Sequence, residues 1–273
     1  MTTRQRLRRV LMVMAAISAS GSVALAQQPT PLFKWPEGKR LALSLSFDDA
    51  RASQVEAGTA LLDRYGVKAT FYVLPSNVES RLNGWKKAVA SGHEIGNHTL
   101  HHPCSANFAF SRRTALEDYT LERMRQELLD ANARIKELLG VTPESFAYPC
   151  GETFVGRGLN TRSYVPIAAS LFTSSRVWMS ETTNEPSLVD FDQLMGIESD
   201  GKDFEQILPL VVEAAKSGRW LVLAGHKMGR DGVQTTRLAM LEKLIQYALI
   251  PANGVWIAPV GTVARYVREA RKG

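Results

Sequence analysis

Short apolar runs alternate with longer amphipathic stretches along most of the chain, and this alternation limits the fold more than any other feature. The apolar runs have the length of strands, whereas the amphipathic stretches repeat their apolar residues at intervals of three and four, as helices do. The clearest helical pattern covers residues 120–139 and is followed by Gly140, a residue that often ends a helix. Strands separated by helices usually pair in parallel. The sequence therefore predicts an α/β fold with a parallel sheet or barrel.

The same patterns predict where the individual elements lie. Strands are expected at residues 41–47, 69–74, 94–95, 146–148, 167–172, 220–223 and 255–258. Helices are expected at residues 55–65, 85–90, 120–139, 204–215, 238–249 and 263–271. Residues 180–202 show no clear periodicity, and we interpret them as a long functional loop.

The first 26 residues differ in composition from the rest of the chain. Four arginines among the first nine residues precede an apolar run from Val10 to Ile17, and Ala24-Leu25-Ala26 offers small residues for cleavage. This order is typical of a secretory signal peptide, and the apolar run is shorter than the roughly 20 residues of a spanning helix. We therefore expect export to the periplasm or the medium, and no stable membrane span in the mature chain.

The net charge also changes when this leader is set aside. The whole chain carries +6, of which the four leader arginines supply four charges, so the remainder carries only +2. A body this close to neutral has no electrostatic sign of nucleic-acid binding. Residues 27–40 contain three prolines and are expected to form an extended segment before the domain that begins at Leu41.

Polar residues with catalytic chemistry gather at the ends of predicted strands. Four of the five histidines fall between positions 93 and 102, and His98 and His102 have the spacing that places two imidazoles on one face of a helical turn. Asp48 and Asp49 end the first strand, and His226 follows the strand at 220–223. Such strand ends collect catalytic groups, so a metal-dependent hydrolase is favoured. The alternatives are a polar surface loop for the histidines and a helix N-cap for the aspartates.

Four motifs in order resemble those of a known family. They are Ser46-Phe47-Asp48-Asp49, His98-Thr99-Leu100-His101-His102, Tyr148-Pro149-Cys150-Gly151, and Leu221-Val222-Leu223 leading to His226. Together they resemble the polysaccharide deacetylases, which include chitin and peptidoglycan N-acetylglucosamine deacetylases and some acetylxylan esterases. The resemblance covers about residues 41–267. It implies a distorted (β/α) barrel with fewer than eight strand units, forming a single catalytic domain over residues 41–273.

The resemblance also implies a role for each motif residue. Asp49, His98 and His102 would bind a divalent metal, most often zinc, with Asp48 as general base and His226 as general acid. The backbone N–H of Cys150, beside Tyr148, would help to hold the oxyanion. Three protein ligands leave a position on zinc for water and for the substrate carbonyl. His101 is the alternative second imidazole ligand, and His93 is expected to make structural hydrogen bonds.

Two departures from the family pattern stand out. Many members have an arginine that orients the base two residues before the proline of the third motif, where this chain has Ala147. Arg176 is our candidate substitute, and a surface position for it is the alternative. The family's aspartate-tryptophan element, which tunes the catalytic histidine, is not recognisable here. Trp178 is nearby without a matching aspartate, and it belongs either to the sugar groove or to the core.

The only two cysteines, Cys104 and Cys150, are candidates for a disulfide. An exported chain meets an oxidising compartment, and the resemblance brings the regions of both cysteines to one cleft. Two buried, unpaired thiols are the alternative. A bridge would brace the segment whose Cys150 N–H is expected to face the oxyanion.

These observations predict a metal-dependent hydrolase that removes acetyl groups from a carbohydrate. The favoured reaction is N-deacetylation of N-acetylglucosamine units in an oligo- or polysaccharide. The alternatives are a carbohydrate O-acetyl esterase and a non-catalytic carbohydrate-binding protein of the same fold.

Overall fold

Eight parallel strands form the central sheet of the structure, a computed structural model that describes residues 32–178 and 181–272. Seven of them follow one another in the order β7-β4-β3-β2-β1-β9-β8, and the eighth, β12, pairs with β1 alone. Their bounds are β1 Leu41–Asp48, β2 Thr70–Val73, β3 Glu94–Asn97, β4 Ser145–Ala147, β7 Ser174–Arg176, β8 Ile197–Glu198, β9 Trp220–Gly225 and β12 Val255–Ile257.

The two ends of this strand order meet, so the sheet curves round into a barrel. Arg176 of β7 forms a parallel bridge with Leu194, three residues before β8. The N–H of Val177 donates to the carbonyl oxygen of Leu194 at 2.9 Å, and the N–H of Leu194 donates to that of Ser175 at 2.9 Å. The expected fold class, a distorted (β/α) barrel with fewer than eight strand units, is confirmed by seven strands around this path.

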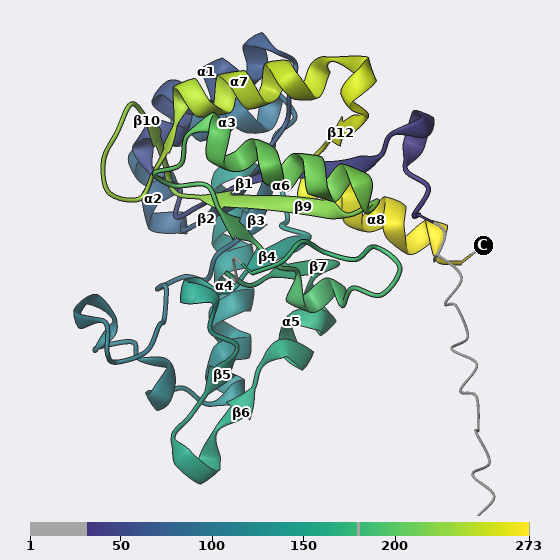
Figure 1. Cartoon of the computed structure of the whole chain (residues 1–273). Coiled ribbons are helices and arrows are strands. Elements are labelled where there is room, and N and C mark those ends of the chain that lie inside the picture. Colours follow the sequence, from purple (N-terminus) through teal and green to yellow (C-terminus); the bar gives the residue numbers. More distant parts are fainter. Residues whose placement is uncertain (1–31, 179–180, 273) are drawn as a thin grey trace, which may run out of the picture. The chain divides into compact units, whose positions relative to one another are not determined.

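Helices connect successive strands and cover the outside of the sheet (Figure 1). They are α1 Thr59–Arg64, α2 Pro75–Ser80, α3 Leu82–Ala90, α4 Leu121–Leu139, α5 Val165–Leu171, α6 Phe204–Lys216, α7 Leu238–Leu249 and α8 Val260–Ala270. A π-helical turn, Gln54–Gly58, leads into α1. Two short strand pairs lie outside the barrel, namely β5 Phe154–Val155 with β6 Arg162–Ser163 and β10 Lys227–Gly229 with β11 Thr235–Arg237.

Helix α4 shows how local sequence sets an element's bounds. Thr120 precedes the helix, and its side chain accepts a hydrogen bond from the N–H of Arg123, which satisfies one free donor of the first turn. Gly140 ends the helix in the left-handed conformation, with φ 75°, where a residue without Cβ meets no steric penalty. Five apolar residues between them are buried at intervals of three and four, namely Met124, Leu128, Ala131, Ile135 and Leu139.

Strand β1 is buried on both faces and sorts its residues between them. Leu41, Leu43, Leu45 and Phe47 belong to the large apolar cluster that also contains buried residues of α1, α3, α6 and α7. The alternate residues face the other way, and the last of them is Asp48. A strand buried on both faces is the usual result of parallel pairing with helical cover. Strand β1 thereby places the carboxylate of Asp48, its last residue, in the barrel interior.

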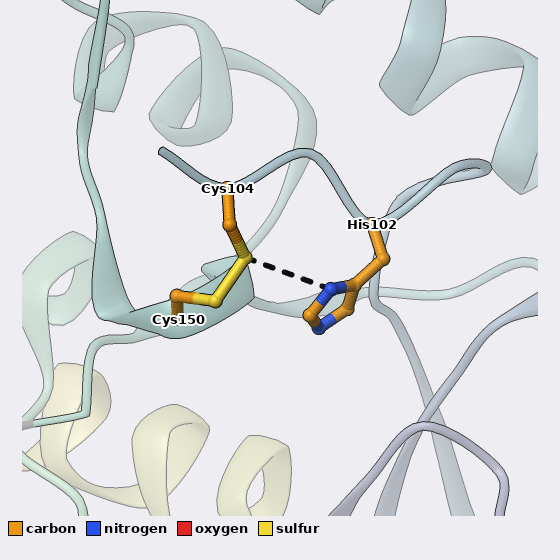
Figure 2. A group of neighbouring side chains, drawn as sticks. All are labelled: His102, Cys104 and Cys150. Atoms are coloured by element: carbon orange, nitrogen blue, oxygen red, sulfur yellow. Dashed lines mark hydrogen bonds between the residues drawn. A yellow bond between two sulfur atoms is a disulfide. The ribbon is translucent and has the colours of Figure 1, made fainter. Parts of the chain in front are cut away.

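Cys104 and Cys150 are joined by a disulfide, the pairing that the sequence favours over two free thiols. It connects the segment after β3 to the 3-10 turn Pro149–Gly151 after β4 (Figure 2). Their Cα atoms lie 6.0 Å apart. The loop that it closes spans 46 residues, for which the chain-entropy account gives a stabilisation of about 4 kcal/mol.

Two predicted elements are wrong. Residues 167–172, expected to form a strand, lie largely in the helix α5, and the strand follows as β7. Pro166 in the first turn of α5 is a residue that suits a helix start, and a short apolar run does not by itself distinguish strand from helix. Residues 180–202, interpreted as a loop, contain the 3-10 turn Phe191–Gln193 and the barrel strand β8.

The expected signal peptide, residues 1–26, lies outside the described residues. Of the expected extended segment, residues 32–40 are described, and Trp35 anchors them by donating from its indole N–H to the carbonyl oxygen of Gly218 at 3.0 Å. No helix within residues 32–178 and 181–272 has both the length and the apolarity to cross a bilayer.

Candidate active site

The carboxyl ends of the barrel strands surround a pocket of about 540 Å³. Six of the residues singled out in the sequence line it, namely Asp48, Asp49, His98, His102, Cys150 and His226. Trp178 lines it too, which resolves the choice between groove and core in favour of the groove. Phe108 and Phe110 form part of its wall and are 44% and 66% exposed.

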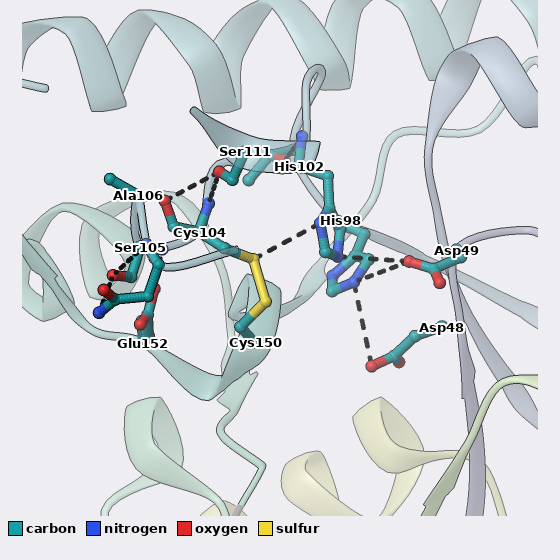
Figure 3. The surroundings of a disulfide bond; sticks show 12 residues. Asp48, Asp49, His98, His102, Cys104, Ser105, Ala106, Ser111, Cys150 and Glu152 are labelled. Atoms are coloured by element: carbon teal, nitrogen blue, oxygen red, sulfur yellow. Dashed lines mark hydrogen bonds and ion pairs between the residues drawn. A yellow bond between two sulfur atoms is a disulfide. The ribbon is translucent and has the colours of Figure 1, made fainter. Parts of the chain in front are cut away.

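Asp49, His98 and His102 converge on one point of this pocket. The Nε2 atoms of both histidines lie 3.4 Å from Oδ1 of Asp49 (Figure 3). One donor atom from each of the three residues lies within 4.8 Å of the other two. Asp49 and the following Ala50 have φ of 73° and 53°, so the chain turns sharply after β1. This turn lets two adjacent carboxylates reach the same pocket.

The segment that carries the two histidines is a loop and not the helical turn assumed from their spacing. Thr99 and His102 both have left-handed backbones, with φ of 67° and 52°, and these bends bring the two rings to 4.9 Å between centroids. Glu127 of α4 holds the loop, because its carboxylate accepts the N–H groups of Leu100 and His101 at 3.0 and 2.6 Å. The i, i+4 spacing correctly predicted that the rings of His98 and His102 lie together, but the helical turn that it implied is absent from this segment.

The three residues fit a divalent metal. Oδ1 of Asp49 is buried and has no hydrogen-bond donor among the described residues, although an unpaired buried carboxylate oxygen is costly. Nδ1 of His98 lies 2.8 Å from the carbonyl oxygen of Ala147, which requires a proton on Nδ1 and leaves the Nε2 lone pair facing Asp49. Two imidazole nitrogens and one carboxylate form a ligand set typical of zinc.

His101 and His93 lie apart from this cluster. The ring of His101 is 56% exposed, and its Nδ1 lies 2.9 Å from Oε2 of Glu127. Nδ1 of His93 accepts the N–H of Ala69 at 3.1 Å, which is the structural kind of hydrogen bond expected for this residue. The geometry thus favours His102 over His101 as the second imidazole ligand.

Asp48 lies beside the ligand cluster and pairs with Arg176. Both carboxylate oxygens accept from Nη2 of Arg176, at 2.5 and 2.6 Å, and both side chains are almost fully buried. In the sheet register Arg176 on β7 stands directly opposite Ala147 on β4. The cation that pairs with Asp48 therefore comes from the strand beside the one that carries Ala147. Gly196 makes room for it, because a Cβ there would lie 2.8 Å from Cδ of Arg176.

His226 lines the same pocket at the end of β9 and has a carboxylate partner that the sequence did not reveal. Its Nδ1 lies 2.7 Å from Oδ2 of Asp200, while Oδ1 of Asp200 accepts from the hydroxyl of Thr236 at 2.7 Å. The ring of Trp178 lies against that of His226, with centroids 4.8 Å apart. An aspartate and a tryptophan therefore both contact His226, although no aspartate-tryptophan element is recognisable in the sequence. Asp200 was missed because it lies in the stretch interpreted as a loop.

The pKa shifts of these groups follow from their surroundings. Burial, followed by the charge of His98, lowers the pKa of His102 to about 4, so its imidazole is neutral and free to bind a metal at neutral pH. Burial alone would raise the pKa of Asp49, but its interaction with His98 and the charges of His102 and Arg51 hold that pKa well below its ordinary value.

His226 shifts in the opposite direction. Burial would lower its pKa, but the hydrogen bond to Asp200 and the charges of Asp48, Asp49 and Asp200 together raise it above the ordinary value. The raised pKa increases the share of His226 that carries a proton near neutral pH, and this favours a role as general acid.

Tyr148 does not reach the pocket, so a direct role for its side chain in oxyanion or substrate binding is not supported. The side chain is buried against Phe146 and Tyr164, and its hydroxyl donates to the carbonyl oxygen of Asp192 at 2.9 Å. Cys150, two residues later, does line the pocket. Its backbone is left-handed, with φ 56°, and its oxyanion role remains a prediction.

A single amide connects the strands that carry Asp48 and His226. Nε2 of Gln54, on the π-helical turn, donates to the backbone carbonyl oxygens of both residues at 2.7 Å. Gln54 is buried, and nothing in its sequence context indicated this position.

The architecture defines the class: a distorted (β/α) barrel whose polar groups gather at the carboxyl ends of its strands. A family model described as polysaccharide deacetylase matches residues 25–163, just over half of the chain. The chain belongs to the polysaccharide deacetylase family, a family of carbohydrate deacetylases.

Individual relatives are distant. A peptidoglycan-N-acetylglucosamine deacetylase of Bacillus cereus is 25% identical over 244 residues, covering 88% of this chain and 96% of that protein. Gellan lyase of a Bacillus species is 23% identical over 265 residues, and the match covers 86% of this chain but only 10% of the lyase. The crystal structure of a putative polysaccharide deacetylase from Mycobacterium smegmatis superimposes with a TM-score of 0.64 at 18% identity, covering 89% of this chain and 95% of that one. The structural likeness shows a shared fold.

Proposed function

We propose that this chain is an exported, metal-dependent hydrolase that removes the acetyl group from N-acetylglucosamine units of an oligo- or polysaccharide. The observation that carries the proposal is the meeting of three groups in one pocket: the Asp49–His98–His102 cluster, the Asp48–Arg176 pair and the His226–Asp200 pair. Family membership supports the reaction class, and the name of the Bacillus cereus relative supports N-acetylglucosamine as the sugar.

In this proposal each residue has one task. Asp49, His98 and His102 hold a divalent cation, most suitably Zn²⁺, which when bound supplies Lewis-acid activation of water and of the acetyl carbonyl. Asp48 accepts the proton of the attacking water, and Arg176 fixes the direction of its carboxylate. The N–H of Cys150 donates to the acetyl oxygen as negative charge develops there. His226 gives its proton to the departing nitrogen.

The pocket wall suits a sugar substrate. Trp178, Phe108 and Phe110 offer aromatic faces beside the polar cluster, and exposed aromatic side chains around a polar cavity are typical of ligand-binding grooves. We assign the catalytic domain to residues 41–273, preceded by a cleaved signal peptide at residues 1–26.

A carbohydrate O-acetyl esterase is the second candidate. An alcohol leaves more readily than an amine, so an esterase depends less on its general acid. The raised pKa of His226 and its hydrogen bond to Asp200 favour the amide, because they preserve an acid that the ester would hardly need. A non-catalytic carbohydrate-binding protein would need neither the Asp48–Arg176 pair nor the His226–Asp200 pair.

Acetate release tests the proposal. The purified mature chain should release acetate from chitin oligomers, lose this activity on treatment with a chelator, and regain it with Zn²⁺. Peptidoglycan fragments and acetylated xylan assayed in parallel identify the polymer and the type of bond. Binding of chitin oligomers without any acetate release, in protein loaded with Zn²⁺, would instead support the non-catalytic alternative.

The ligand assignment has its own test. His102→Ala should abolish retention of Zn²⁺ in a metal analysis after gel filtration, because it removes one of three ligands. His101→Ala should retain the ion, because this ring contacts Glu127 on the loop's outer side. The opposite pattern would show that His101 is the ligand.

A further inference from the structure

The disulfide lies directly against one of the proposed metal ligands. Sγ of Cys104 is 3.6 Å from Nδ1 of His102, within the range of hydrogen bonds to sulfur (Figure 2). The other ring nitrogen, Nε2, lies on the far side of the ring and faces Asp49 at 3.4 Å. His102 therefore stands between the disulfide and the point where the ligand atoms converge (Figure 3).

The chemistry of a disulfide settles which ring nitrogen carries the proton. A disulfide sulfur has no hydrogen, so it can only accept, and Nδ1 of His102 must be the donor in this contact. A neutral imidazole carries one proton, so Nε2 is left with its lone pair free toward Asp49. His98 reaches the same tautomer through a carbonyl oxygen, that of Ala147 at 2.8 Å.

We propose that the Cys104–Cys150 disulfide is a positioning group for the metal site, and that the affinity of the site for its cation depends on whether this disulfide is intact. Partners that receive the second N–H of a ligating histidine fix its tautomer and its ring orientation. Here that partner is a sulfur whose position depends on a bond between two loops. The inference rests on the ligand role of His102 in the proposed function.

Hydrogen bonds on both sides of the disulfide hold the backbone near Cys104, and none of them involves a sulfur atom. Ser111 accepts the N–H of Cys104 at 2.7 Å and donates to its carbonyl oxygen at 2.9 Å. Glu152, two residues after Cys150, accepts the N–H of Ser105 at 2.7 Å. The bond between Ser105 and Glu152 joins the same two segments, and the Ser111 bonds fix the backbone at Cys104, so the backbone is expected to keep its course when the sulfur atoms are removed.

The bond is open to reduction. Cys104 is fully buried, but Cys150 is exposed and lines the pocket. A dithiol entering the pocket can attack there, transfer two electrons and two protons, and leave two protein thiols while it becomes a cyclic disulfide itself. A free Cys104 thiol can rotate away from His102 or turn its own hydrogen toward the ring, and the Nδ1 proton then loses its fixed acceptor.

The test compares a double variant with a matched control. Cys104→Ala with Cys150→Ala removes both sulfur atoms; single variants are avoided because a remaining thiolate is itself a metal ligand. Ser111→Ala is the control, because it loosens the same segment and leaves the disulfide in place. Competition with a chromophoric chelator gives the Zn²⁺ dissociation constant, and nitrogen NMR of the metal-free protein gives the tautomer of His102.

We expect the double variant to bind Zn²⁺ about 10- to 100-fold more weakly than the wild type, and Ser111→Ala to stay within about threefold. The wild type and Ser111→Ala should show a proton on Nδ1 of His102 alone, and the double variant a mixture of both tautomers. Equal affinity and an unchanged tautomer in the double variant would overturn the inference. Failure of the wild type to bind Zn²⁺ would instead count against the proposed function, so the two failures are distinguishable.

Discussion

Asp48 and His226 end neighbouring strands, β1 and β9, yet the protein surrounds them in different ways. Asp48 is almost fully buried and pairs with the permanent cation of Arg176. His226 opens to the pocket, and its partner is an anion, Asp200, that raises its pKa. The proposed base, Asp48, is thus held by a buried ion pair. The proposed acid, His226, has a raised pKa and stays accessible from the pocket. Breaking the Asp48–Arg176 pair should therefore lower the free energy of unfolding. Breaking the His226–Asp200 pair should change the pH dependence of the reaction.

The largest effect is expected from removing the base itself. Asp48→Asn should reduce acetate release by about 10²- to 10⁴-fold, because the water no longer has a proton acceptor. The variant should still bind Zn²⁺, since Asp49 and not Asp48 belongs to the ligand cluster. Turnover and bound metal measured on the same preparation check this. Full activity would move the base role to another residue.

Breaking the ion pair from its other end should cost stability. Arg176→Met leaves a buried carboxylate without its cation, and loss of one partner of a buried pair typically costs about 3–5 kcal/mol. Urea unfolding measures the free energy of unfolding. Adding Asp48→Asn to this variant should restore much of the loss, because the uncompensated charge is then gone. A single variant as stable as the wild type would show that the pair contributes little.

Changing the partner on the acid side should move a pH profile. Asp200→Asn weakens the hydrogen bond and removes one of the charges that raise the pKa of His226, so this histidine loses its proton at lower pH. The alkaline limb of kcat/KM should therefore shift to lower pH, with a rate loss of about tenfold or more above it and much less below it. If the alkaline limb does not shift, it reports the titration of a group other than His226.

The same variant gives a stability signature with a defined sign. A histidine whose pKa is raised by folding contributes stability that is complete below its unfolded pKa and is lost as the pH rises through the folded one. Asp200→Asn should therefore cost more free energy of unfolding at about pH 5 than at about pH 9.

The smallest effect is expected when the leaving group changes. On an O-acetyl ester, Asp200→Asn should cost about threefold or less, because an alkoxide departs with less help from an acid. Asp48→Asn should harm amide and ester alike, since both need the same attack by water. Rates on acetylated xylan and on chitin oligomers give the comparison. Equal losses on both substrates in Asp200→Asn would contradict the assignment of His226 as the acid.

The sequence predicted well what is local to a strand and its end. Asp48 and Asp49 follow a largely apolar run, and His226 follows another, so parallel pairing alone places all three at one edge. His98 and His102 were selected for a helical spacing that the structure replaces with two left-handed residues. Their pairing was correct because any tight turn can bring residues four apart together.

The sequence could not reveal contacts that join distant, irregular segments. Asp200 meets His226 only because β8, a strand of two residues, pairs with β9. A strand this short produces no periodicity to detect. Arg176 was named as a candidate from its position alone, and only the register of β7 against β4 explains why it fits.

That register determines which strand supplies the cation beside Asp48. Positions 147 and 176 are side by side on adjacent strands, so an arginine at either one approaches the same carboxylate. In this chain the guanidinium reaches Asp48 from β7, and position 147 on β4 holds an alanine. This approach depends on Gly196, whose lack of a side chain leaves space for the side chain of Arg176. A search for an arginine within the third motif alone would miss this ion pair, because the positive charge lies one strand away.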